Sequence, residues 1–234
     1  ENEMRNAILL FTVICLLVST PGFAQDSLNI ERTGGGLYSY WQAALSVTTS
    51  GNYAYVATRQ SNVKILDISD PTHPFEVGMW DDGRVISSAV AISGNILYVA
   101  AGWAGLKVID VSDPCHPFEV NSIELDGEVS DLLIRDNQLF LSNWGIRIMD
   151  ISDPVEPREI GFCATGTTEG LAYVEDHIYL ADGSRGLDIV DISDLNSPEL
   201  VGTCDTPGLA RDVTVMSGFA FVACRSSGLR VINV

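Results

Sequence analysis

Residues 187–202 read LDIVDISDLNSPELVG, and similar stretches recur along the chain. The other copies are VKILDISDPTHPFEVG from Val63, LKVIDVSDPCHPFEVN from Leu106, IRIMDISDPVEPREIG from Ile146 and the short LRVINV from Leu229. A marker residue at the fifth position (Asp67, Asp110, Asp150, Asp191 and finally Asn233) returns after 43, 40, 41 and 42 residues. A repeat of this period indicates a fold built from successive copies of one supersecondary unit.

Each unit contains four short runs rich in Val, Ile and aromatic residues, which are separated by Gly, Asn, Asp or Pro. In the second unit we predict strands at 89–92, 96–100, 106–111 and 118–123. Four strands in about 40–45 residues is typical of one propeller blade, and no segment has the apolar period of a helix. The sequence therefore predicts an all-β fold, a β-propeller of four-stranded antiparallel blades. Five blades are expected, or a fragment of a larger propeller.

The pentapeptide at 187–191, with Gly186 before it and Ile192-Ser193-Asp194 after it, resembles the LVIVD repeat family. The resemblance covers roughly residues 43–234, with Leu195 in place of a usual proline and Asn233 in place of the last marker acid. It implies a β-propeller in a bacterial or archaeal protein that is secreted or displayed at the cell surface. It implies no particular reaction.

The first 24 residues have the pattern of a secretory signal. Arg5 follows Met4, an apolar run extends from Ala7 to Val18, and Pro21-Gly22 precedes Ala24. The apolar run is too short to span a hydrocarbon core of about 30 Å as a helix. We therefore predict a leader at 1–24, a propeller domain at 25–234, export to the periplasm, cell surface or medium, and no transmembrane segment in the mature chain.

The charge balance limits the partners of this chain. Thirteen Lys and Arg residues stand against 31 Asp and Glu residues, which gives a formal net charge of −18. Nucleic acids and anionic membranes attract clustered cations, so neither is an expected partner. Part of the acidity comes from one turn copied four times, because each copy supplies a marker Asp and a second Asp three residues later.

The repeated acids have two interpretations. Asp67 and Asp70, with their copies, could ligate calcium, or they could fix the turn between the third and fourth strands of a blade. Asp followed by Pro is favourable turn chemistry, and the dense oxygen ligands of a calcium loop are missing, so we favour the turn. The glycines before the third strand, Gly105, Gly145, Gly186 and Gly228, are expected at positive φ.

Candidate binding residues fall on the face formed by the loops after the second and fourth strands, which vary between copies. The predicted ligand-binding set is Trp41, Arg59, Arg84, Trp103, Trp144, Arg185, Arg211 and Arg225. Trp and Arg are enriched at binding hot spots, and such a patch could hold a sugar, a carboxylate or a peptide. The alternative is that the Trp residues pack between blades while the Arg residues neutralise nearby Asp.

No catalytic or metal-binding motif stands out. His73 and His116 occupy equivalent turns, zinc-ligand spacing is missing, and no GxSxG or phosphate-loop motif occurs. Among the cysteines that follow the leader we favour unpaired thiols, and Cys204 with Cys224 is the pair that merits a test. Cofactors are not expected.

Two ways of completing the propeller remain open. Residues 28–32 could supply the fourth strand of the last blade, or further blades could follow residue 234. For function, we predict a non-catalytic binding module for an extracellular protein or glycan. The alternatives are an extracellular propeller glycoside hydrolase or lyase, and a fragment whose activity or anchor lies in a missing C-terminal region.

Overall fold

The computed structural model describes residues 43–59, 62–81, 83 and 86–234. These residues form nineteen β-strands and one 3-10 turn, η1 (Arg225–Ser227). The leader at 1–24, the segment at 28–32, Trp41 and Arg84 lie outside the described residues. Within the described ranges there is no helix with the length and apolar character that membrane crossing requires.

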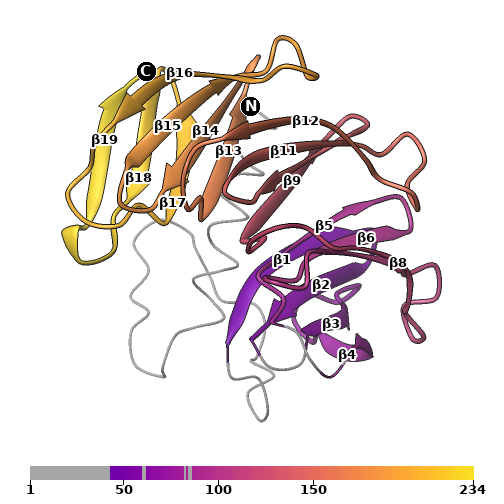
Figure 1. The fold of residues 1–234 in the computed structure, drawn as a ribbon. Coiled ribbons are helices and arrows are strands. Elements are labelled where there is room, and N and C mark those ends of the chain that lie inside the picture. Colours follow the sequence, from indigo (N-terminus) through magenta and orange to yellow (C-terminus); the bar gives the residue numbers. More distant parts are fainter. Residues whose placement is uncertain (1–42, 60–61, 82, 84–85) are drawn as a thin grey trace. The chain divides into compact units, whose positions relative to one another are not determined.

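The strands form five sheets in chain order (Figure 1). The first contains β1 (Ala44–Ser50), β2 (Tyr53–Thr58), β3 (Asn62–Asp67) and β4 (Phe75–Trp80). The second contains β5 (Ala89–Ser93), β6 (Ile96–Ala100), β7 (Leu106–Asp110) and β8 (Phe118–Ile123). The third contains β9 (Asp131–Arg135), β10 (Gln138–Ser142), β11 (Gly145–Asp150) and β12 (Arg158–Ala164). The fourth contains β13 (Gly170–Val174), β14 (His177–Asp182), β15 (Gly186–Asp191) and β16 (Glu199–Cys204), and the fifth contains β17 (Asp212–Met216), β18 (Phe219–Ala223) and β19 (Leu229–Asn233).

The predicted β-propeller fold is confirmed, since each sheet is one blade and follows the sequence repeat. Successive strands within a blade are neighbours, and every pair with a described register is antiparallel. Four blades have four strands, and the fifth has three among the described residues. Blade boundaries predicted from the repeat match the second sheet to within one residue at either end of a strand.

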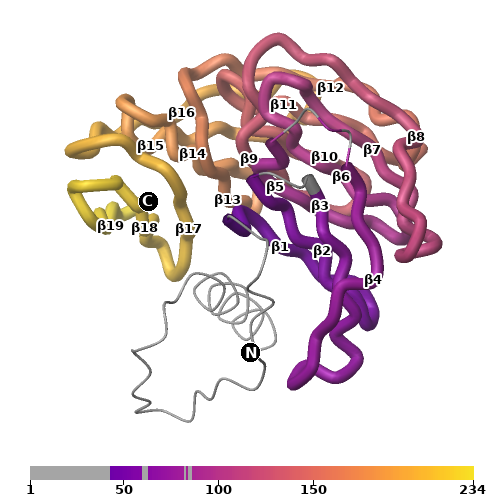
Figure 2. The backbone as a smooth tube through the Cα atoms, turned by 90° about the horizontal axis from the view of Figure 1, so that it is seen from below, coloured from indigo at the N-terminus to yellow at the C-terminus, as the bar shows by residue number. Residues whose placement is uncertain are grey.

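Two compact units make up the described chain. The first comprises residues up to 99 together with 108–120, and the second comprises residues 100–107 together with 121–234. In the first unit β1 lies beside β5, and in the second β13 lies beside both β9 and β17 (Figure 2). The first strands of neighbouring blades are therefore next to one another within each unit.

Burial follows the order of strands in a blade. All five residues of β6 are buried, whereas most of β16, an outer strand, is exposed. The second unit has a core of Phe140, Ile146, Ile148, Leu180 and Val190, and a second core under its last blade. The middle strands have continuous apolar sequences because both of their faces are covered. Burial of each large aliphatic side chain stabilises the fold by about 1.5–3 kcal/mol.

The repeated acids act as turn residues, as the sequence predicted. Each marker Asp accepts a hydrogen bond from the backbone N–H two residues later, as between Asp67 Oδ1 and Ser69 N at 2.8 Å, and Asp110, Asp150 and Asp191 do the same. The second Asp repeats this geometry, as between Asp70 Oδ1 and Thr72 N at 2.9 Å. Side-chain and backbone hydrogen bonds from Thr72 lower the pKa of Asp70 to about 2. These carboxylates therefore hold the turn by accepting hydrogen bonds from its backbone.

That turn packs against the preceding blade at one recurrent point. A Cβ added to Gly161 on β12 would lie 2.0 Å from the carbonyl oxygen of Leu195, and Gly78 on β4 faces Pro114 O at the same distance. The second blade carries Asn121 at the equivalent strand position, and its Nδ2 donates a hydrogen bond at 2.8 Å to Val155 O, one residue beyond the equivalent carbonyl. Glycine at this position thus leaves room for the turn carbonyl of the following blade, and Asn121 instead forms a hydrogen bond to a neighbouring carbonyl of the same turn.

The first strands of neighbouring blades are also linked through side chains. Ser46 Oγ accepts a hydrogen bond from Val90 N at 3.3 Å, and Asp131 Oδ2 accepts one from Leu171 N at 3.0 Å. Ser46 and Asp131 both lie in the first strand of their blades, directly before a buried residue, Val47 or Leu132. Burial raises the pKa of Asp131 to about 7.

The glycine contact gives a stability prediction with an internal control. Gly161→Ala forces a methyl group onto Leu195 O and is expected to lower the free energy of unfolding by about 1–3 kcal/mol. Gly202 occupies the equivalent position on β16, where an added Cβ would meet nothing closer than Ile189 at 3.5 Å. Gly202→Ala is expected to change stability by less than about 0.5 kcal/mol. Urea denaturation followed by circular dichroism measures both, and equal losses would contradict the contact.

Candidate functional site

In the second to fifth blades a glycine ends the loop between the second and third strands. Gly105, Gly186 and Gly228 have φ between +74° and +91°, and Gly145 has φ +127°, as predicted. A Cβ at Gly145 would lie 2.1 Å from Cys163 O on the neighbouring strand, so the backbone approach also excludes a side chain. These fixed glycines anchor loops whose other residues vary.

The loop of the third blade is shorter than the others and strains one residue. Only Asn143 and Trp144 separate β10 from β11, whereas five residues separate β6 from β7. Trp144 consequently has φ +50°, a left-handed conformation that is rare for a bulky side chain. Backbone strain of this kind gathers at functional sites.

The two loop tryptophans that the sequence singled out meet in the structure. The indole rings of Trp103 and Trp144 have centroids 6.3 Å apart and an interplanar angle of 83°, an edge-to-face contact. Trp103 remains 70% exposed and Trp144 48% exposed. Gly127 lies against the Trp144 ring, where a Cβ would be 2.9 Å from Cδ2. Two large apolar rings are thus held in place and left open to solvent.

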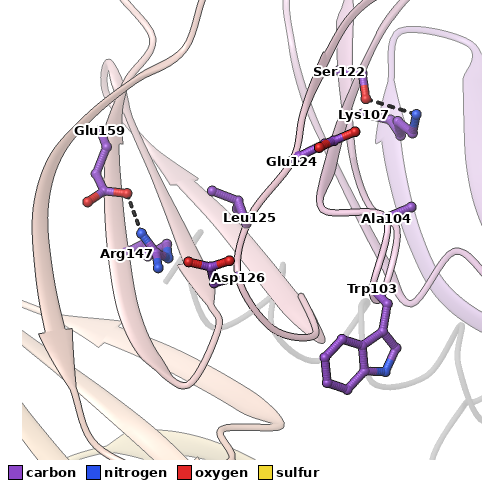
Figure 3. A pocket seen from close by; sticks show the side chains of 9 residues that line it. All are labelled: Trp103, Ala104, Lys107, Ser122, Glu124, Leu125, Asp126, Arg147 and Glu159. Atoms are coloured by element: carbon purple, nitrogen blue, oxygen red, sulfur yellow. Dashed lines mark hydrogen bonds and ion pairs between the residues drawn. The ribbon is translucent and has the colours of Figure 1, made fainter.

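A hollow of about 620 Å³ opens beside Trp103 (Figure 3). Its lining consists of Trp103, Ala104, Lys107, Ser122, Glu124, Leu125, Asp126, Arg147 and Glu159. In Figure 3 Lys107 and Ser122 form one side, Arg147 and Glu159 form the other, and the segment 124–126 runs between them. Every lining residue belongs to the second unit.

The charged groups of the hollow are held by hydrogen bonds. Arg147 donates from Nε to Asn143 Oδ1 at 2.7 Å and from Nη1 to Glu159 Oε2 at 2.5 Å, and its guanidinium lies 4.4 Å from the Phe162 ring centroid. Lys107 Nζ donates to Ser122 Oγ at 2.9 Å. Exposed Glu124 and Asp126 add two carboxylates. The hollow therefore offers donors and acceptors in fixed positions beside an aromatic surface, an arrangement common to sites for small polar ligands.

The predicted arginines separate into different environments. Arg59 is exposed in the first unit, while Arg185, Arg211 and Arg225 belong to the second. Arg211 forms an ion pair with Glu169. Arg211 and Arg225 both line a shallower hollow of about 380 Å³ with Cys224 and Leu229. The ligand-binding role of the set stays a prediction.

Sequence reasoning missed a buried acid pair on the fourth blade. Asp182 ends β14 and Asp188 lies on β15, and both side chains are completely buried. Arg185 Nε lies 3.1 Å from Asp188 Oδ2 and 3.4 Å from Asp182 Oδ2. Burial, followed by the influence of Asp188, raises the pKa of Asp182 to about 6.

A signal for this pair was present in the repeat. The second residue of the repeat stretch pairs with the outer strand, and in the fourth blade it is Asp188, which lies opposite Thr203. The other four blades have a cation there, namely Lys64, Lys107, Arg147 and Arg230. The charge at this repeated position is therefore inverted in the fourth blade.

His and Cys side chains are the usual ligands of zinc, and pairs of Cys side chains can form disulfide bonds. Among residues 43–59, 62–81, 83 and 86–234 no group of three or more His, Cys, Asp or Glu side chains could hold a metal ion. Cys115, Cys163, Cys204 and Cys224 are free thiols, including the pair chosen for a test. His73 and His116 each contact the second Asp of their turn, at 3.1 and 2.8 Å.

Comparison with protein families identifies the repeat. The LVIVD repeat model matches residues 43–82, 86–124, 126–165, 165–206 and 207–234. The chain belongs to the LVIVD repeat family. The five LVIVD matches coincide with the five sheets, so each family repeat is one blade.

Solved structures similar to this LVIVD chain include two computationally designed proteins. The designed Ika8 protein aligns with a TM-score of 0.62 at 15% identity, over 80% of this chain and 57% of its own. The designed Ika4 protein aligns with a TM-score of 0.53 at 16% identity, over 68% of this chain and 98% of its own. The chain thus spans little more than half the length of Ika8, and the likeness concerns fold alone. Curated proteins gave no match.

The buried Asp182 predicts a pH-dependent stability difference. Its folded-state pKa of about 6 lies above the ordinary value of 3.8, so the folded protein holds this proton more tightly than the unfolded chain does. Ionising Asp182 therefore costs stability as the pH rises through 4 to 6, and Asp182→Asn avoids that cost. Relative to the parent, the variant should gain about 1–3 kcal/mol between pH 4 and pH 8. Denaturation at both pH values measures the gain, and exposed Asp136→Asn, which should show none, is the control.

Proposed function

We propose that this chain is an exported, non-catalytic binding module whose ligand is an extracellular glycan. The site consists of the hollow beside Trp103 and of the Trp144 ring, which contacts the Trp103 ring edge to face. The single observation that carries the proposal is the exposed tryptophan pair: two indoles that are 70% and 48% exposed contact each other, and contiguous exposed apolar surface of this kind marks interaction sites.

The chemistry of the hollow suits a saccharide. A sugar ring has an apolar C–H face that packs on an indole, and it carries hydroxyl groups that must keep hydrogen bonds when they leave water. Lys107, Arg147, Glu124 and Asp126 provide donors and acceptors close to Trp103. Since both kinds of group line one hollow, a ring can be stacked and hydrogen-bonded at once.

The buried acid pair of the fourth blade has no part in the proposed glycan site. A glycoside hydrolase needs two carboxyl groups that reach the scissile bond from opposite sides. The acid pair with the perturbed pKa, Asp182 and Asp188, has no exposed side-chain surface and is engaged by Arg185. These two carboxyl groups are therefore poorly placed to touch a substrate.

If the hollow binds a glycan, removal of either indole should weaken the affinity for that glycan. With the mature protein, a glycan array should identify a ligand, and titration followed by tryptophan fluorescence should give its affinity. Trp103→Ala is expected to weaken binding roughly tenfold or more, because truncating an aromatic hot spot costs about 2 kcal/mol. Trp144→Gly should do the same while relieving the positive φ.

The matched control is Phe118→Ala, which removes an aromatic side chain that is 55% exposed on β8 and lies outside the hollow. Its affinity should equal that of the parent. Unchanged binding in Trp103→Ala would place the ligand elsewhere. An array that returns peptides and no glycan would overturn the saccharide assignment in favour of a protein partner.

A further inference from the structure

The fourth blade rearranges a charge that the other blades keep on a strand. In three blades the cation of the third strand is tied to the outer strand, through Lys64 to Glu76, Lys107 to Ser122 and Arg147 to Glu159. In the fourth blade the same position is Asp188, opposite Thr203. The cation comes instead from Arg185 in the loop.

The cation of the fourth blade is therefore a guanidinium at the loop surface, and two buried carboxylates bind it. Both ion pairs are made by Arg185 Nε, at 3.1 and 3.4 Å, to carboxylates with no exposed surface. The Arg185 side chain itself is 47% exposed. With Nε fixed, Nη1 and Nη2 form a preoriented fork, which is the geometry that pairs bidentately with a carboxylate.

Stability alone is a weak reason for such a cluster. Burying two carboxylates costs several kcal/mol each, and a single half-exposed cation compensates only part of that cost. The surroundings are shaped around the group, since a Cβ at Gly166 would lie 2.5 Å from Asp182 Oδ1 and 2.8 Å from Arg185 Cδ. A well-fitted but costly polar cluster at the surface is typical of a functional site.

We propose that Arg185 is a carboxylate-binding site, in which Asp182 and Asp188 orient the guanidinium and its two Nη groups pair with the carboxylate of a ligand. Thr165 and Asp205 are the further polar groups that act on this cluster. Because burial raises the pKa of Asp182 to about 6, its protonated form is accessible and leaves the triad without net charge when the ligand arrives. The site lies on the fourth blade, shares no residue with the hollow beside Trp103, and does not depend on the glycan proposal.

The test uses the mature chain labelled with nitrogen-15 and follows the Arg185 Nε–Hε resonance during titration. Sodium galacturonate presents the carboxylate on a sugar, N-acetylglycine presents it as at a peptide end, and galactose is the neutral probe. At least one carboxylate is expected to shift the resonance in a saturable manner, and the stronger of the two identifies the source. Galactose should leave the resonance unchanged. An equal response to galactose, or no response to either carboxylate, overturns the proposal.

Two variants test whether binding depends on the bidentate geometry of the Arg185 guanidinium or only on its charge. Arg185→Lys keeps the charge but loses the fork, and it should weaken carboxylate binding at least fivefold, followed at the backbone amides of Gly183 and Gly186. Arg158→Gln removes an exposed arginine that pairs with Glu156 on the surface, and it should bind as the parent does. Equal affinity in parent and Arg185→Lys, or an equal loss in Arg158→Gln, would overturn the assignment. The titration of the unaltered protein decides the question if Arg185→Lys fails to fold.

Discussion

The close contact between a turn carbonyl and the outer strand of the preceding blade is the constraint on which this structure depends. Leu195 O lies over Gly161 so tightly that a methyl group would be 2.0 Å away. The conformation of the turn is fixed because the marker Asp and the second Asp each accept a hydrogen bond from the backbone N–H two residues later. Local turn chemistry therefore sets the spacing between blades, and the same device is repeated along the chain.

A scaffold fixed on one side leaves the opposite loops free to vary. In the second to fifth blades a glycine at positive φ fixes the end of the loop before the third strand, and the other loop residues differ in number and kind. Shortening the third loop to two residues places Trp144 in a left-handed conformation and brings it to the edge of Trp103. The aromatic surface therefore combines two loops of different length on neighbouring blades.

The repeat also explains how much of the site could be read in advance. The blades, the turn role of the acids and the positive φ of Gly105 and its equivalents follow from residue type and period, because these are local preferences. The grouping of Trp103 with Trp144 on one face was also predictable, since equivalent loops share a face. The Asp182–Arg185–Asp188 cluster was not recognised, because its residues look like ordinary members of an acidic chain. A comparison of each repeated position across the blades would have exposed the inversion at Asp188.

By itself the sequence determined the all-β fold, the family, the blade boundaries and the chemistry of the turns. Each of these depends on neighbours within a few residues or on a pattern copied five times. Only the tertiary structure decided which side chains meet, namely the 6.3 Å contact of the two indoles and the burial of two carboxylates beneath one arginine. The physical reason is that desolvation and ring contact depend on what neighbouring strands and blades place around a residue, and a residue's type and position in the repeat leave that open.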